Sequence, residues 1–368
     1  MMNPKDFVQF LNLESVNYFC GVPDSYLKSL IQEFEKKDHI PMPNEGSAIA
    51  HATGYYLAHH KPALVYMQNS GLGNAINPLL SSAHELVYGI GMLLFIGWRG
   101  EEGTHDEPQH LVQGESLLPM LASMKIKYQI LSSDFEKAKV QIKNALEEIK
   151  ITPAPYAFVL KKDLFKSSKS IPKVNVSKIS RFEVIKTTIQ KSPKAIYVAT
   201  TGHTARELYQ AQLDLKLDEL KCFYHTGAMG HASQLALGLA LHRPKEKVIL
   251  FDGDGSMAMH LGNYLSIKQT HPANFKIICF NNDSHLSVGG QHTCWDDSSI
   301  TKTVNAMGIK SAPVLKQKVY QKKLLEFLNS EDLFIEVLCK NEIKNELPRP
   351  KETHLELKQK LMDQLNAN

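Results

Sequence analysis

Short apolar runs alternate with amphipathic stretches along almost the whole chain. The runs at 63–67 and 248–251 have the length of buried strands and lead into turns rich in Gly and Asn or Asp. The stretch 133–150 repeats apolar residues at helical spacing, which predicts a helix. Alternating strand and helix patterns are typical of an α/β fold built on parallel sheets. Further predicted strands are 18–20, 91–96, 127–131, 156–160, 195–199, 221–223, 275–280 and 333–338, and further predicted helices are 6–13, 47–59, 181–190, 317–328 and 353–365.

The alternating pattern occurs twice and is interrupted by one polar segment. Residues 166–180 are rich in Lys and Ser and show little periodicity, which predicts an interdomain linker. We therefore predict two doubly wound α/β domains, at 1–165 and 181–368, with no third domain between them.

Composition narrows the class of protein. Of the 368 residues, 43% are hydrophobic and 22% are charged, as in ordinary globular proteins. The formal net charge is +4 and the lysines are scattered, so we expect no nucleic-acid partner. The longest apolar run, 86–96, is too short to span a membrane, and the five cysteines form no CxxC pair. Together with an N-terminal stretch that lacks a secretory pattern, these features predict a cytoplasmic protein with reduced thiols and no membrane partner.

Two predicted strands end in residues suited to bind a metal. Strand 248–251 runs into Gly253-Asp254-Gly255-Ser256, and strand 275–280 ends in Asn281-Asn282. Because the carboxyl ends of parallel strands meet at one edge of the sheet, we expect Asp254 and Asn282 to lie close together. Their oxygens suit a hard cation such as Mg²⁺, and the glycines let backbone N–H groups approach a phosphate. Taken alone, Gly-Asp-Gly is equally typical of a turn.

Other loops that follow predicted strands also carry polar side chains. Asp24 and Ser25 follow the first strand, where either residue serves equally well to cap the next helix. Glu45 lies at the start of a helix, where the helix dipole alone favours a carboxylate. The long polar loop 97–110 contains cationic donors of the kind that an anionic substrate needs, namely Arg99, His105 and His110.

The spacing of the GDGS motif at 253–256 and the Asn281-Asn282 pair closely resembles the cofactor signature of thiamine diphosphate enzymes. The resemblance implies that Asp254, Asn282 and the backbone carbonyl of Ser284 hold Mg²⁺ against the diphosphate. It also implies that Glu45 hydrogen-bonds N1′ of the aminopyrimidine and so stabilises the tautomer that removes the thiazolium C2 proton.

Further cofactor contacts follow from the same resemblance. A bulky apolar residue at the position of Met229 wedges between the two cofactor rings in this family. The turn after strand 195–199 opens a helix, where backbone N–H groups suit an anion. The remaining expected cofactor-binding residues are Gly202, His203, Thr204, Gly253, Gly255, Ser256, Asn281 and Leu286.

Longer strings carry a closer resemblance: GVPDSYLK from Gly21, NEGSAIAHATGYYLA from Asn44, YMQNSGLGNAINPL from Tyr66, IGWRGEEGTHDEPQH from Ile96, TTGHTARELY from Thr200 and HLSVGGQHT from His285. Together they resemble the phosphonopyruvate decarboxylase family, a compact form that lacks the central domain of most 2-oxo acid decarboxylases. The resemblance implies conversion of 3-phosphonopyruvate to phosphonoacetaldehyde and CO₂ in phosphonate biosynthesis. Two positions depart from the family pattern: Asp283 replaces a common glycine and His292 an expected proline, both near the substrate.

The resemblance also implies residues that act on the substrate, and a partner. The candidates for proton transfer are Asp24, His105, His110 and His285. A phosphonate needs cationic or polar donors, for which we expect Ser25, Arg99, Gln109 and Gln291. In this family the cofactor lies between the first domain of one subunit and the second domain of another, which implies a homodimer at minimum.

Two alternatives stay open. A decarboxylase of sulfopyruvate or another anionic 2-oxo acid would share the fold and cofactor; one chain with both domains and a Trp98-Arg99 loop favours the phosphonate. A phosphate-binding α/β protein without thiamine chemistry would give Glu45 no role, so Glu45→Gln would leave its activity unchanged. Thiamine chemistry predicts a loss of orders of magnitude in that variant.

Overall fold

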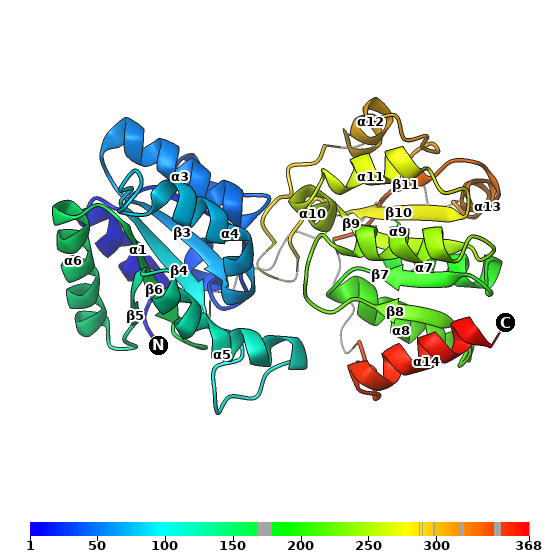
Figure 1. Ribbon diagram of the computed structural model, residues 1–368, viewed down its shortest axis with the longest axis horizontal. Helices are drawn as coiled ribbons and strands as arrows, with labels where there is room; N and C mark the ends of the chain where they lie inside the picture. The colour runs from blue at the N-terminus through cyan, green and yellow to red at the C-terminus, as the bar shows by residue number, and fades with distance from the viewer. Residues whose placement is uncertain are drawn as a thin grey trace. The chain divides into compact units, whose positions relative to one another are not determined.

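The computed structural model describes residues 1–167, 179–286, 288, 290–296, 299–316, 320–341 and 347–367. The chain divides into two compact units (Figure 1). The first comprises residues 1–171 with 287–291, and the second comprises residues 172–286 with 292–368. Of the predicted linker 166–180, residues 168–178 lie outside the described part of the chain.

The first unit is built on a parallel sheet of six described strands in the order β2-β1-β3-β4-β6-β5. Strands β3, β4 and β6 are almost fully buried because helices cover both faces, which explains their continuous apolar runs. The strands are β1 (Phe19–Gly21), β2 (His39–Pro41), β3 (Ala63–Gln68), β4 (Met92–Gly97), β5 (Lys127–Ile130) and β6 (Pro155–Leu160). The helices are α1 (Pro4–Leu13), α2 (Lys28–Ile31), α3 (Glu45–His59), α4 (Leu72–Pro78), α5 (Pro108–Ser123) and α6 (Phe135–Ile151), with short helical turns η1 (Lys36–Asp38), η2 (Asn69–Gly71) and η3 (Leu79–Ala83).

The second unit contains a parallel sheet of five described strands in the order β11-β10-β9-β7-β8. Its last helix, α14, packs beside the edge strand β8 (Figure 1). The strands are β7 (Ile196–Ala199), β8 (Lys221–Tyr224), β9 (Val248–Gly253), β10 (Phe275–Asn281) and β11 (Phe334–Leu338). The helices are α7 (Arg181–Lys191), α8 (His203–Leu215), α9 (Ala232–His242), α10 (Asp254–Met259), α11 (Asn263–Thr270), α12 (Ser299–Ala306), α13 (Gln321–Asn329) and α14 (His354–Asn366).

The predicted fold class of two parallel-sheet α/β units is confirmed. The short edge strand β2 was not predicted, because three half-exposed residues that end in Pro41 carry little strand pattern. The alternative role of Ser25 as a helix cap is wrong: α2 begins at Lys28, and Leu27 occupies its N-cap position without a side-chain hydrogen bond.

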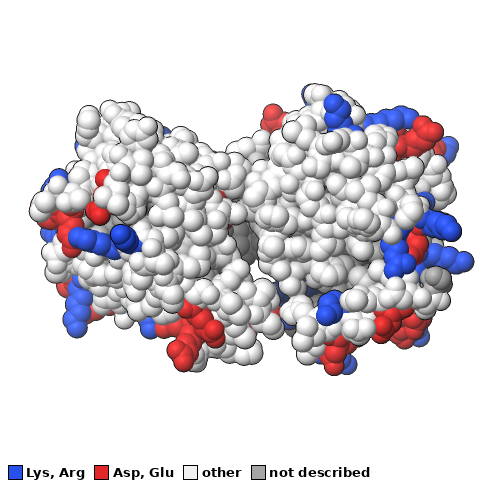
Figure 2. Space-filling view, viewed as in Figure 1, with Lys and Arg blue, Asp and Glu red and all other residues white. Residues whose placement is uncertain are grey.

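The surface mixes charges of both signs. On the face shown in Figure 2, most of each unit's surface is uncharged, and basic and acidic side chains lie near one another toward its margins. Within the described ranges, no helix is both long enough and apolar enough to cross a membrane.

Candidate active site

Glu45 is a buried carboxylate at the start of α3. The helix begins at Glu45 because the side chain of Asn44 accepts a hydrogen bond from the backbone N–H of Ser47, at 2.8 Å. The Oε2 of Glu45 accepts a hydrogen bond of 2.8 Å from the side-chain amide of Asn74, and only 4% of the residue is exposed. Burial raises the pKa of Glu45, and the hydrogen bond from Asn74 opposes that rise.

Gly71 provides the space that this carboxylate occupies. A Cβ atom at Gly71 would lie 2.1 Å from the Oε1 of Glu45, far inside contact distance. Gly73, in the same loop, has no atom within 4 Å of its own Cβ position. Within the Gly-rich sequence 68–74, position 71 must therefore be glycine if Glu45 is to keep its place, whereas position 73 has room for a side chain.

Asp24 is a second buried carboxylate, three residues after β1. It is fully buried, and its Oδ2 accepts a 3.3 Å hydrogen bond from the backbone N–H of Tyr26. The Oδ1 of Asp24 has no hydrogen-bond partner among the described residues. Burial raises the pKa of Asp24 to about 6, although the nearby guanidinium of Arg99 opposes the rise. A carboxyl group with this pKa can exchange a proton near neutral pH.

Arg99 follows β4 and is held by several partners from the first unit. Its Nε and Nη2 donate to the two carboxylate oxygens of Asp106, with an Nε to Oδ2 distance of 2.8 Å. Its Nη1 lies 3.3 Å from the hydroxyl oxygen of Ser25, to which it donates, and its guanidinium carbon lies 5.1 Å from the ring centroid of Tyr26. The side chain of Asn69 accepts from the backbone N–H of Arg99 and donates to its carbonyl oxygen.

The other predicted residues of loop 97–110 lie in different surroundings. His105 is exposed, whereas Gln109 and His110 are half-buried in the first turn of α5. The Oε1 of Gln109 and the Nδ1 of His110 are buried, and neither has a hydrogen-bond partner in the described part of the chain. Burial lowers the pKa of His110, and the charge of Arg99 lowers it further. Gln291, which groups with the first unit, likewise has a buried Oε1 without a described partner.

In the second unit, the predicted metal ligands follow adjacent strands. Asp254 comes directly after β9 and Asn282 directly after β10, and these strands pair in register up to Gly253. The carboxylate of Asp254 is buried; its Oδ2 accepts a 2.8 Å hydrogen bond from the hydroxyl of Thr293. Burial raises the pKa of Asp254 to about 6. Ser284 is buried, and its hydroxyl oxygen has no partner among the residues described.

The two asparagines at the end of β10 have different environments. Asn281 is buried; its side-chain amide donates to Glu336 at 2.8 Å and accepts from the backbone N–H of Asp283 at 3.0 Å. Asn282 is half-buried and makes one long side-chain contact of 3.4 Å, to Asn341. The amide of Asn281 is therefore engaged within the fold, while the amide oxygen of Asn282 is better placed to bind a ligand.

Gly255, Met229 and His285 meet at the start of α10. A Cβ atom at Gly255 would lie 2.8 Å from the ring of His285 and 3.3 Å from the methyl carbon of Met229. Burial lowers the pKa of His285 to about 4, so its imidazole is neutral at physiological pH. The structure thus brings together three residues that are far apart in the sequence, and Leu286 follows half-buried.

The remaining predicted cofactor residues surround the ends of β7 and β9. The hydroxyl of Ser256 lies 3.0 Å from that of Thr200 and accepts a 3.2 Å hydrogen bond from the backbone N–H of Gly230. Gly202 precedes α8 with a φ of 93°, a conformation that favours glycine. His203 and Thr204 form the first turn of α8; burial lowers the pKa of His203, as do the charges of two nearby arginines.

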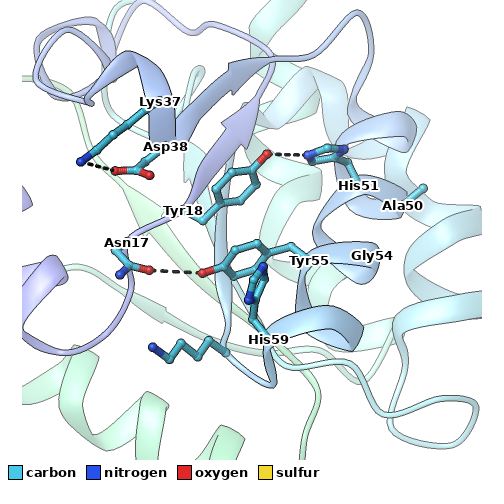
Figure 3. Close-up of a pocket in the computed structure, with 10 residues that line it drawn as sticks. Asn17, Tyr18, Lys37, Asp38, Ala50, His51, Gly54, Tyr55 and His59 are labelled. Carbon is cyan, nitrogen blue, oxygen red and sulfur yellow. Dashed lines mark hydrogen bonds and ion pairs between the residues drawn. The ribbon is translucent and has the colours of Figure 1, made fainter.

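A cavity of about 770 Å³ opens in the first unit at the amino ends of the strands, away from the strand ends that carry Asp24 and Arg99 (Figure 3). It lies between the start of β1 and the second half of α3, and none of the predicted site residues lines it. The rings of Tyr18 and Tyr55 stack there with centroids 4.4 Å apart, and the Tyr18 hydroxyl lies 2.7 Å from the Nε2 of His51. The hydroxyl of Tyr55 donates to Asn17 at 3.2 Å. Because these polar groups already bind one another, the cavity is a weaker candidate than the strand ends.

Comparison with protein families identifies both halves of the chain. Residues 4–119 match the N-terminal TPP binding domain of thiamine pyrophosphate enzymes, and residues 203–337 match the C-terminal TPP binding domain. The chain belongs to the thiamine pyrophosphate enzymes.

Curated relatives lie within the same family. The chain is 30% identical to phosphonopyruvate decarboxylase of Streptomyces hygroscopicus, over 84% of this chain and 80% of the relative. It is 29% identical to phosphonopyruvate decarboxylase of Streptomyces viridochromogenes, over 84% of this chain and 81% of the relative. It is 26% identical to sulfopyruvate decarboxylase of Methanosarcina acetivorans, over 86% of each chain. The prediction of a compact thiamine diphosphate-dependent carboxy-lyase is thereby confirmed.

The donor set at the ends of β9 and β10 fits the metal-bound diphosphate of such an enzyme. Within the described residues, no three His, Cys, Asp or Glu side chains are grouped to hold a metal ion. A cation beside Asp254 would therefore be bound through one carboxylate together with amide and carbonyl oxygens, the hard ligands that Mg²⁺ prefers. A cation would also compensate the buried charge of Asp254, for which the described residues provide no ion pair.

Several residues of these sites were missed by the sequence analysis. Asn74 binds Glu45 from 29 positions away, and Thr293 binds Asp254 from 39 positions away, so neither pair has a local pattern. Asp106 was also missed, although an acidic residue seven positions after Arg99 in one polar loop was an available signal.

Proposed function

We propose that this protein decarboxylates 3-phosphonopyruvate to phosphonoacetaldehyde and CO₂, with thiamine diphosphate and Mg²⁺, as a step of phosphonate biosynthesis. The observation that carries the proposal is the buried carboxylate of Glu45, held by Asn74 in a chain 30% identical to a phosphonopyruvate decarboxylase. A sulfopyruvate decarboxylase is the second candidate.

The choice of substrate rests on identity over most of the chain. Two relatives named phosphonopyruvate decarboxylase are 30% and 29% identical, against 26% for the sulfopyruvate enzyme of Methanosarcina acetivorans. The expectation that a single chain with both domains favours phosphonate does not hold. That sulfopyruvate enzyme matches 86% of this chain and so spans both halves as well. Chain organisation therefore does not distinguish the two substrates.

Glu45 is the proposed partner of the aminopyrimidine. When bound, thiamine diphosphate accepts the electron pair that is released as CO₂ leaves. The raised pKa of Glu45, caused by burial, suits a carboxyl group that shares a proton with a ring nitrogen. Asn74 orients the carboxylate, and Gly71 leaves the space that it occupies.

The second unit is proposed to hold the diphosphate and to shape the cofactor. Asp254, Asn282 and the carbonyl of Ser284 would bind Mg²⁺, with Thr293 orienting the Asp254 carboxylate. Met229 would pack against the cofactor rings from beside Gly255. The backbone at Gly202, His203 and Thr204 would face phosphate oxygens.

The first unit also carries the proposed substrate groups. Asp24 has a pKa of about 6 and an unpartnered oxygen, which suits proton transfer to the carbon that loses CO₂. Ser25 and Arg99 would meet the anionic end of the substrate. His110 of the first unit and His285 of the second unit, whose imidazole is neutral through burial, are further proton-transfer candidates. His105 is the weakest of the predicted group because its side chain is exposed.

The proposal extends to assembly and location. We propose a homodimer at minimum, because the family resemblance implies that Glu45 and Asp254 of one site come from different subunits. A cytoplasmic location agrees with five free cysteines, four of which are buried. Light scattering that showed an active monomer would contradict the dimer.

The direct test measures aldehyde release from phosphonopyruvate, sulfopyruvate and pyruvate in parallel, with and without thiamine diphosphate and Mg²⁺. We expect cofactor-dependent turnover of phosphonopyruvate, and a loss of at least about 10²-fold in Glu45→Gln. Preferred turnover of sulfopyruvate would retain the chemistry and replace the substrate. Unchanged activity in Glu45→Gln would exclude thiamine chemistry at this site.

A further inference from the structure

Asp106 lies in the polar loop between β4 and α5 and accepts hydrogen bonds from five donors, of which the Tyr26 hydroxyl, at 3.5 Å, is the most distant. The Nε and Nη2 of Arg99 donate to its two oxygens, and the backbone N–H groups of Gly100 and Glu107 donate at 2.9 and 2.8 Å. Only 3% of the Asp106 side chain is exposed, against 20% for Arg99. Burial alone would raise the pKa of Asp106, but hydrogen bonds from Arg99 and the backbone hold it well below the usual range. The carboxyl group of Asp106 is therefore ionised at neutral pH and holds the Arg99 guanidinium in place.

The hydrogen bonds to Asp106 leave the Nη1 edge of the Arg99 guanidinium for another partner. Two of the three nitrogens are committed to Asp106, and Nη1 donates to the Ser25 hydroxyl at 3.3 Å. The ring of Tyr26, 5.1 Å from the guanidinium carbon, limits rotation of the plane. An arginine fixed in this way loses little conformational freedom when it binds an anion.

A second observation indicates that a polar ligand belongs near this loop. α5 begins two residues after Asp106, and its first two turns carry three buried polar atoms without a described partner. These atoms are the Oε1 of Gln109, the Nδ1 of His110 and the Oε1 of Gln113. Buried polar atoms are nearly always hydrogen-bonded in folded proteins, so this group is suited to bind a polar molecule.

We propose that Asp106 is the positioning residue for recognition of the substrate's anionic end: it fixes Arg99 so that Nη1 and the Ser25 hydroxyl bind oxygens of a phosphonate or sulfonate group. The inference rests on the proposed function and adds to it a residue that does not touch the substrate. The competing interpretation is that Asp106 neutralises Arg99 and so competes with the anion. Removing Asp106 would then strengthen anion binding.

The test measures binding and catalysis separately in the cofactor-loaded enzyme. The binding probe is 3-phosphonopropionate, a carboxylate with the same anionic end but no 2-oxo group, titrated by calorimetry. We expect Asp106→Asn to raise its Kd about tenfold or more, the effect of weakening a charge-assisted hydrogen bond. KM for phosphonopyruvate should rise similarly, while KM for pyruvate, which lacks the anionic end, should change less than about threefold.

Two further variants make the test specific. Glu101→Gln is the matched control, because Glu101 lies in the same loop and pairs with Lys161 instead of Arg99. It should leave the Kd within about twofold of the wild-type value. Arg99→Ala should weaken binding at least as much as Asp106→Asn, and the double variant should be no worse than Arg99→Ala, since the two residues act as one unit.

The outcomes separate this inference from the proposed function. A lower Kd in Asp106→Asn, or equal rises in KM for both substrates, would overturn the positioning role while leaving phosphonopyruvate turnover in place. Conversely, tighter phosphonate binding by wild type than by Asp106→Asn, without turnover of phosphonopyruvate, would support the anion site and reject the proposed substrate. Circular dichroism of each variant confirms that the comparison is made on folded protein.

Discussion

The Nδ1 of His292 lies 2.8 Å from the Oδ2 of Asp283, so the two residues that depart from the family pattern contact each other. Asp283 has a φ of 52°, in the left-handed region, which accounts for the glycine expected there. Its other carboxylate oxygen accepts a longer hydrogen bond of 3.5 Å from Thr293, which also donates to Asp254. The two departures thus form one contact beside a proposed metal ligand.

This backbone geometry predicts an ordering of variants at position 283. Asp283→Gly removes the side-chain contact but relieves the left-handed strain, so its stability should stay within about 1 kcal/mol of wild type. Asp283→Ala removes the contact and keeps the strain, and should be about 1 kcal/mol less stable than the glycine variant. Urea unfolding midpoints measure the difference. Equal midpoints for the glycine and alanine variants would contradict a left-handed backbone conformation at Asp283.

The buried carboxyl of Asp24 predicts a pH-dependent stability effect. Its pKa is raised from 3.8 to about 6, so the folded state binds this proton more tightly than the unfolded state. Stability is therefore lost as the pH rises from about 4 to about 6 and stays reduced above that range. Asp24→Asn removes the penalty and should stabilise the protein by up to about 3 kcal/mol at pH 8, with no gain below pH 4. Thermal unfolding from pH 3.5 to 8 provides the measurement; a gain that is constant across the range would disprove the shift.

Alanine at Gly71 and alanine at Gly73, two glycines of one loop, should have very different effects on kcat. A methyl group at Gly71 would collide with Glu45, so Gly71→Ala should displace the carboxylate and lower kcat by about tenfold or more. Gly73→Ala meets no atom within 4 Å and should change kcat less than about threefold. The measurement is kcat at saturating cofactor for both variants. Similar losses of kcat in the two variants would show that the order of the loop, and not the position of Glu45, determines the effect.

The two adjacent asparagines should respond differently to substitution. Asn281 is engaged by Glu336 and the backbone of Asp283, so Asn281→Ala should destabilise the protein by about 1 to 3 kcal/mol. Asn282→Ala should keep its stability without ligand but lose the rise in melting temperature that Mg²⁺ and thiamine diphosphate give the wild type. Differential scanning calorimetry without and with both ligands measures the stability of each variant and the rise in melting temperature that the ligands cause. An unaltered ligand response in Asn282→Ala would remove that residue from the metal site.

Sequence patterns were informative where the determinant is local. The buried strands β3, β4 and β9 are recognised by continuous apolar runs, and the GDGS and Asn-Asn motifs directly follow strands whose adjacency is set by parallel topology. The edge strand β2 has too few residues and too little burial to leave such a pattern. Fold class could therefore be predicted more completely than strand count.

Residue roles were harder to predict because they depend on contacts distant in sequence. Arg99 was expected to be a simple cationic donor, but Asp106 commits two of its nitrogens, and this pairing depends on how one long loop closes. Similarly, nothing near Glu45 in the sequence indicates that Asn74 orients it, because the pairing requires α3 and α4 to pack together. Such contacts follow from tertiary packing, which residue spacing does not encode.

The helix α3 joins Glu45 to the cavity of Figure 3. Its 15 residues form a rod of about 22 Å that starts at the carboxylate and carries His51 and Tyr55 further along. Glu45 and Tyr55 belong to one helix, so a shift of α3 along its axis would also change the overlap of the Tyr55 ring with the Tyr18 ring, which now stack with centroids 4.4 Å apart. Near-ultraviolet circular dichroism of this tyrosine pair would therefore report such a helix shift without an added label.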